Sequence, residues 1–143
     1  MNSYIADPMS LLKDISYLWV FFSVVVAYAI GAVWYSPKVF LMPWLEMTGV
    51  KEKDMQKNGM KAMLYNLPIT IGIAMYIWGW YTFVGLDSVW YGLALGLDLG
   101  TFVCLFIGMN YLYEWRPFSL FAITAGYTLL TSMLMWVIIA LFS

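Results

Sequence analysis

The segment from Trp90 to Met109, WYGLALGLDLGTFVCLFIGM, is a long apolar run with one carboxylate, Asp98, near its middle. A helix rises about 1.5 Å per residue and a hydrocarbon core is about 30 Å thick, so roughly twenty residues span it. A central aspartate costs about 2.5 to 3.5 kcal/mol, while each Leu, Ile, Phe or Val returns about 0.3 to 0.6 kcal/mol. Because the segment holds many such residues, it predicts a membrane-spanning helix that tolerates the acid.

Small residues recur at every fourth position of this segment, at Gly92, Gly96, Gly100, Cys104 and Gly108. Such a stripe lets a neighbouring helix backbone approach closely, which is how helices pack in lipid. At 100° per residue, Asp98 lies about 160° around the helix from Gly96 and Gly100, and shares its side with Tyr91, Ala94, Phe102 and Leu105. Membrane carboxylates rarely face lipid. We therefore expect Asp98 to need a second partner, a water-filled cavity or a second subunit.

The composition excludes an ordinary soluble globule, because the 143 residues are 64% hydrophobic and only 10% charged. The net charge of -1 gives no indication of a nucleic-acid partner. There is no histidine, and the one cysteine lies inside an apolar run. These counts exclude disulfides within the chain, the usual zinc sites and a His-ligated haem. We expect no catalytic residue, no metal and no cofactor, and hence no enzyme.

Four apolar stretches predict an all-α, four-helix membrane bundle, with one domain over residues 1–143. The predicted helices lie at about 8–34, 62–86, 89–112 and 118–142, and Asp7 followed by Pro8 is typical of a helix start. Residues 37–48 are too apolar for a free linker and too few to span, which predicts a short interfacial helix. In the first span, a second stripe of small residues predicts a packing face at Ser23, Ala27 and Gly31.

Lysine and arginine are distributed unevenly between the two expected sides. The first and third loops hold Lys38, Lys51, Lys53, Lys57, Lys61 and Arg116, whereas the other side holds only Lys13. Short loops rich in Lys and Arg stay cytoplasmic. We therefore expect loop 36–62 to be cytoplasmic and both termini to lie outside.

The stretch IGAVWYSPKVFLMPWLEMTG, residues 30–49, resembles the DUF1761 family of small bacterial membrane proteins, a domain of unknown function. The resemblance rests on Gly31, Trp34, Tyr35, Ser36, Pro37, Phe40, Trp44 and Gly49, on GLALGL at 92–97, on residues 110–117 and on residues 125–127. It implies a four-helix protein of the bacterial inner membrane. It implies no established activity and supplies no catalytic residues.

Three functions are open to such a chain. The favoured one is a non-catalytic structural or accessory protein, surrounded by membrane lipid, that self-associates or packs in a larger complex. The second is a small homo-oligomeric transporter or channel that uses Asp98 to bind a proton or cation. The third is a lipid-modifying enzyme with a polar cluster of Asn66, Asn110, Glu114 and Arg116, gathered on the cytoplasmic side if the second and third spans adjoin. The chain has no histidine and no activated nucleophile, so it offers few groups that could catalyse a reaction on lipid.

Overall fold

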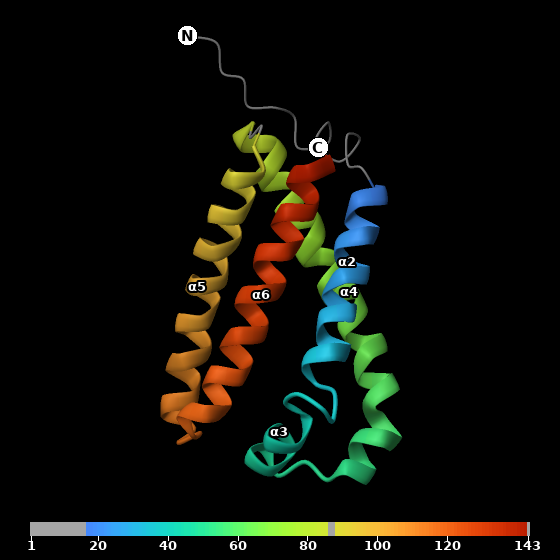
Figure 1. Ribbon diagram of the computed structural model, residues 1–143, viewed down its shortest axis with the longest axis vertical. Helices are drawn as coiled ribbons and strands as arrows, with labels where there is room; N and C mark the ends of the chain where they lie inside the picture. The colour runs from blue at the N-terminus through green and yellow to red at the C-terminus, as the bar shows by residue number, and fades with distance from the viewer. Residues whose placement is uncertain (1–16, 86–87, 143) are drawn as a thin grey trace.

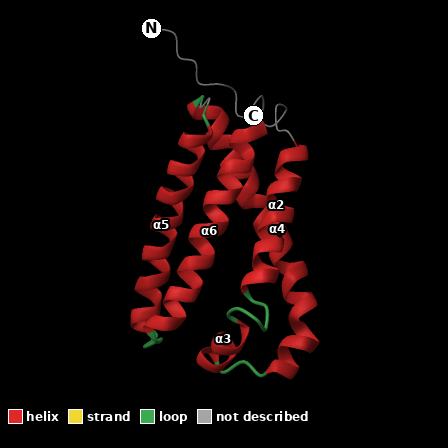
Figure 2. Ribbon diagram, viewed as in Figure 1, coloured by secondary structure: helices red, strands yellow, loops and turns green. Residues whose placement is uncertain are grey.

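The computed structural model describes residues 17–85 and 88–142, and their regular structure is all helical (Figure 2). Four long helices lie side by side: α2 (Tyr17–Trp34), α4 (Glu52–Val84), α5 (Val89–Tyr113) and α6 (Phe118–Phe142). The short helix α3 (Leu41–Thr48) lies at one end of them (Figure 1). Each long helix is apolar enough, over enough residues, to cross a membrane. The helix start expected at Asp7 and Pro8 lies outside the described residues.

The helix boundaries follow from local chemistry. Helix α4 begins at Glu52 rather than near residue 62, and its first turn holds Glu52 and Asp54. Carboxylates there are stabilised by the unpaired amide groups and the positive end of the helix dipole. Helices α3 and α4 each end at a glycine in the left-handed conformation, Gly49 (φ 71°) and Gly85 (φ 68°). Ser88 caps α5 by accepting a hydrogen bond from the amide of Trp90.

Helix α6 is the common partner, because it packs against α2, α3, α4 and α5. Its contact with α5 is the most extensive in the molecule. The best-buried core is shared by α2, α4 and α6, where Ala74 and Ile139 are fully buried beside Ala27 and Ile77. Helix α5 therefore lies at the edge of the molecule, held by α6 along one side.

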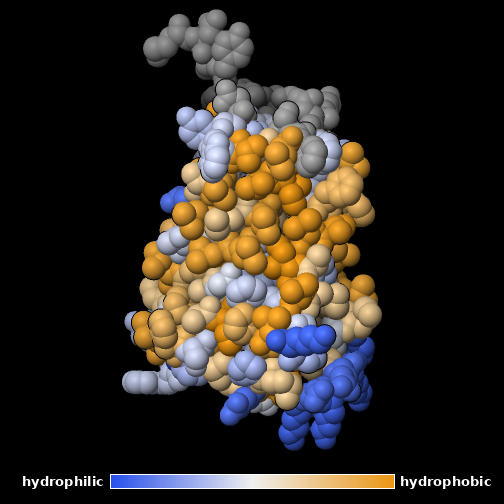
Figure 3. Space-filling view, in the orientation of Figure 1, coloured by the Kyte–Doolittle hydropathy of each residue, from blue (hydrophilic) through white to orange (hydrophobic). Residues whose placement is uncertain are grey.

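The outer surface is largely hydrophobic, and hydrophilic residues gather at the end that carries α3 and the start of α4 (Figure 3). Large apolar side chains such as Phe83, Leu105 and Phe118 are more than half exposed. A contiguous apolar surface of this kind is rare on soluble proteins. It fits lipid.

Hydroxyl groups within the long helices are mostly bonded to their own helix. Ser23 donates to the carbonyl of Trp19 at 2.8 Å, and Thr101 donates to that of Leu97 at 2.7 Å. The same back-bond, to the carbonyl four residues earlier, is made by Thr70, Thr82, Thr124 and Thr128. These hydroxyls therefore need no partner on a neighbouring helix.

The connections alternate between the two ends of the molecule. The segment between α2 and α4, including α3, lies at the same end as the turn between α5 and α6 (Figure 1). The start of α2 and the end of α6 lie at the opposite end. This arrangement is the one that the uneven distribution of lysine and arginine requires.

The turn between α5 and α6 contains a strained residue. Trp115 has φ 57°, and among the described residues it is the one non-glycine with positive φ. The amide of the next residue, Arg116, donates to the carbonyl of Tyr111 at 2.9 Å, which closes the end of α5. Glycine usually occupies this left-handed position, because a Cβ there is unfavourable.

Replacing Trp115 with glycine should stabilise the fold by about 1 kcal/mol, because the left-handed strain is removed. Thermal unfolding in detergent should show a midpoint about 2 to 4 °C higher. Trp90→Gly is the control, since Trp90 is also exposed but lies inside α5. It should lower the midpoint. A lower midpoint for Trp115→Gly would mean that the indole makes contacts that outweigh the strain.

Candidate functional site

Helices α5 and α6 meet along the glycine stripe of α5. A Cβ on Gly96 would lie 2.7 Å from the Cα of Met133, and one on Gly92 would lie 2.8 Å from the Cβ of Ala140. The same added atom on Gly100 would be 3.2 Å from Leu129, and on Gly108 it would be 3.2 Å from the ring of Phe121. Four glycines spaced along α5 thus bring the two helices into close contact from one end to the other.

Asp98 lies on the opposite side of α5 and is exposed. Its side chain makes no hydrogen bond or ion pair within residues 17–85 and 88–142. The residues on its side of the helix, Tyr91, Ala94, Phe102 and Leu105, are exposed as well. This is the placement that helical spacing predicts. The five residues define what we call the Asp98 face, which is exposed in the part of the chain that the structure describes.

The small residues of α2 lie on its inner side. Ser23 and Ala27 are buried. Gly31 faces α6, where an added Cβ would be 3.4 Å from the hydroxyl of Tyr127. One turn later, the indole of Trp34 donates to the carbonyl of Ile123 in α6 at 3.1 Å. The end of α2 is thus fixed to α6 by a hydrogen bond.

The predicted cytoplasmic-side polar cluster does not form. Glu114 and Arg116 pair with each other at 3.1 Å on the exposed turn after α5. Asn110 is exposed near the end of α5. Asn66 lies in α4, where its side-chain amide donates to Thr70. The cluster required the second and third spans to adjoin, but at this end α6 and α2 separate α4 from α5 (Figure 1). Asn110, Glu114 and Arg116 therefore lie together at the end of α5, whereas Asn66 lies apart from them in α4.

Three tyrosines surround a cavity with Asn66, a site that the sequence did not predict. Tyr28 and Tyr35 come from α2 and the turn after it, and Tyr127 comes from α6. The rings of Tyr35 and Tyr127 lie 5.3 Å apart. Burial, followed by the proximity of Tyr127 and Tyr111, raises the pKa of Tyr35 to about 12. One feature of the sequence could have indicated these residues: Tyr28 and Tyr127 lie inside apolar runs rather than at their ends, where membrane tyrosines are more usual.

No group of three or more potential metal ligands occurs among the residues that the structure describes. Cys104 is buried, and its thiol points to the carbonyl of Ala125 in α6 at 3.5 Å. It lies in the glycine stripe and serves there as a small residue.

Four helices of the described chain are long and apolar enough to span a membrane, which is the pattern of helical membrane proteins. The model of a family described as a protein of unknown function, DUF1761, matches residues 18–140. The chain belongs to this family, as its sequence resemblance implied. No curated protein and no solved structure matches it.

The glycine contact predicts a steep cost for one added methyl group. Gly96→Ala would press a Cβ against the backbone of Met133 and should destabilise the protein by about 1 to 3 kcal/mol. Gly72→Ala is the matched control, because Gly72 is also inside a long helix and an added Cβ there meets nothing within 4 Å. It should be neutral or stabilising by up to about 1 kcal/mol. Equal unfolding midpoints for the two variants in detergent would contradict the close contact.

Proposed function

We propose that this chain is a multi-pass membrane protein whose four long helices all cross the bilayer as one bundle. Lysine and arginine place the α3 end in the cytoplasm and both termini outside. The bacterial inner membrane is the location that the family resemblance implies. In this membrane the chain acts as a non-catalytic component that self-associates through the Asp98 face of α5.

The observation that carries the proposal is the exposed, unpaired carboxyl of Asp98 in the middle part of a span. An ionisable group in this position is costly in lipid and almost always faces protein or water. Residues 17–85 and 88–142 offer no partner, because α5 is held chiefly by α6 on its other side. A second copy of the same face would supply the missing contacts, since two such carboxyls can hydrogen-bond when at least one is protonated.

Cross-linking tests the contact directly. Leu105→Cys places a thiol on the Asp98 face, at a position where the leucine is 66% exposed. We expect oxidation in membranes to give a disulfide-linked dimer. The control is Ile69→Cys on α4, where the isoleucine is 60% exposed. It should remain monomeric, as should the wild type with its buried Cys104. Equal dimer yields from the two variants would argue against the proposed face.

The contribution of the carboxyl is measured in the same assay. Adding Asp98→Leu to Leu105→Cys should weaken self-association about threefold to thirtyfold, because an interhelical hydrogen bond in a membrane is worth roughly 0.6 to 2 kcal/mol. Asp98→Asn keeps a hydrogen-bonding group and should retain most of the dimer. An unchanged yield with leucine would mean that Asp98 plays no part in the contact.

The same carboxyl favours a second candidate, a proton- or cation-linked transporter. If copies of the chain arranged their Asp98 faces around one axis, the carboxyls would meet along a shared path. In proteoliposomes, such a protein should carry a proton or cation flux that Asp98→Asn reduces at least tenfold while the dimer persists. A flux equal to that of protein-free liposomes would leave self-association as the function.

A further inference from the structure

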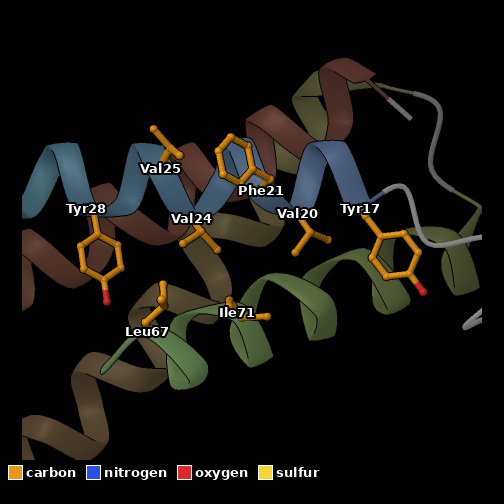
Figure 4. A pocket seen from close by; sticks show the side chains of 8 residues that line it. All are labelled: Tyr17, Val20, Phe21, Val24, Val25, Tyr28, Leu67 and Ile71. Carbon is orange, nitrogen blue, oxygen red and sulfur yellow. The ribbon is translucent and has the colours of Figure 1, made fainter. Parts of the chain in front are cut away.

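Two cavities between α2 and α4 meet at Tyr28. The first, which we call the groove, has a volume of about 530 Å³ and is lined by Tyr17, Val20, Phe21, Val24, Val25, Tyr28, Leu67 and Ile71. In Figure 4, Val24 and Tyr28 project from α2 toward α4, and Leu67 and Ile71 lie opposite. Because Phe21, Val25 and Ile71 are exposed, the groove is open to the surroundings of the helices.

The second cavity, which we call the chamber, has a volume of about 640 Å³ and lies between α2, α4 and α6, with α3 contributing Leu41 and Trp44. Hydroxyl and amide groups are present in its lining, from Tyr28, Tyr35, Asn66, Thr70 and Tyr127. The rest of the lining is apolar. Both volumes fall within the range of about 300 to 1,000 Å³ that is usual for ligand sites.

Tyr28 lines both cavities and links the two helices between which they lie. Its hydroxyl donates to the carbonyl of Met63 in α4 at 2.8 Å. Pro68 follows shortly after, inside α4, and α4 changes direction in its middle part (Figure 1). A proline inside a helix removes one backbone hydrogen bond and kinks it.

Among the residues that the structure describes, no charged side chain lines the chamber or the groove. Helix α4 carries lysines close by in sequence, but they lie on another face. At 100° per residue, Lys57 and Lys61 are each about 160° around the helix from Gly59, which lines the chamber. An anionic head group would therefore be desolvated in the chamber without a cation to pair with, which is costly.

We propose that the groove and the chamber together bind one neutral lipid, with a hydrocarbon chain in the groove and an uncharged, oxygen-bearing head in the chamber. The apolar groove matches the chain, and the phenols of Tyr35 and Tyr127 and the amide of Asn66 match oxygen acceptors on the head. Diacylglycerol and long-chain quinones both have this chemistry. The site lies apart from the Asp98 face, so it does not depend on self-association.

Photolabelling of the full-length protein in vesicles of phosphatidylethanolamine and phosphatidylglycerol tests the proposal. Three probes carry the same diazirine in a hydrocarbon chain: a diacylglycerol, a long-chain quinone and a phosphatidylglycerol. We expect at least one neutral probe to label peptides from residues 17–28 and 67–71 at least fivefold more than the phosphatidylglycerol probe. The neutral probe that labels more strongly identifies the source of the head.

Two glycines in α4 provide a matched pair of variants. Gly59→Leu projects a side chain into the chamber, and Gly72→Leu projects one elsewhere on the same helix. An added Cβ at either position meets nothing within 4 Å, so both variants should fold. Gly59→Leu should reduce the labelling at least tenfold, whereas Gly72→Leu should leave it within twofold of the wild type.

Three results would overturn the proposal. One is labelling of these peptides by phosphatidylglycerol as strong as that by the more strongly labelling neutral probe, which would assign the site to anionic lipid. Another is labelling of Gly59→Leu equal to that of Gly72→Leu. The third is the absence of labelled peptides from α2 and α4 with both neutral probes.

Discussion

The close approach of the α5 and α6 backbones is the contact on which the rest of the structure depends. In lipid, apolar side chains gain nothing by leaving their surroundings, so helices associate through dispersion contacts and hydrogen bonds at short range. The glycines at 92, 96, 100 and 108 allow the backbones of α5 and α6 to approach this closely along most of α5. Helix α6 then has its other sides free for α2, α3 and α4, and the remaining contacts of the fold follow from its central place.

The features that the sequence predicted are local ones. The number of long apolar helices, the family and the side of α5 that carries Asp98 follow from segment length, motif and helical spacing. The predicted start of α4, at residue 62, is ten residues after the observed start at Glu52. The first turns of α4 are charged, and a hydropathy pattern alone does not detect a polar helical segment. The predicted polar cluster does not form, because Asn66 lies on α4 and Glu114 follows α5, and these two helices do not adjoin at that end. The chamber was missed since Tyr28, Asn66 and Tyr127 come from three helices, and only their packing brings them together.

The family segment WYSP acquires a structural meaning from these contacts. Trp34 bonds to α6, and its ring also lies 4.8 Å from that of Phe40. Tyr35 is 5.9 Å from Trp44, which brings α3 under the chamber. The segment therefore joins α2, α3 and α6 at one corner. The Asp98 face is on α5, outside that corner. Substitutions on the Asp98 face therefore need not affect the corner where α2, α3 and α6 meet, and the reverse also holds.

The hydroxyls that bond to their own helix bear on the order in which the molecule assembles. Six serine and threonine side chains already have a carbonyl partner once their helix has formed. Each helix can therefore enter the bilayer without waiting for a neighbour to satisfy these six groups. Between α5 and α6, steric fit along the glycines distinguishes a correct pair from a wrong one. The α5–α6 hairpin, joined by a short turn and matched along its glycines, is the natural first assembly, onto which α2 and α4 can dock.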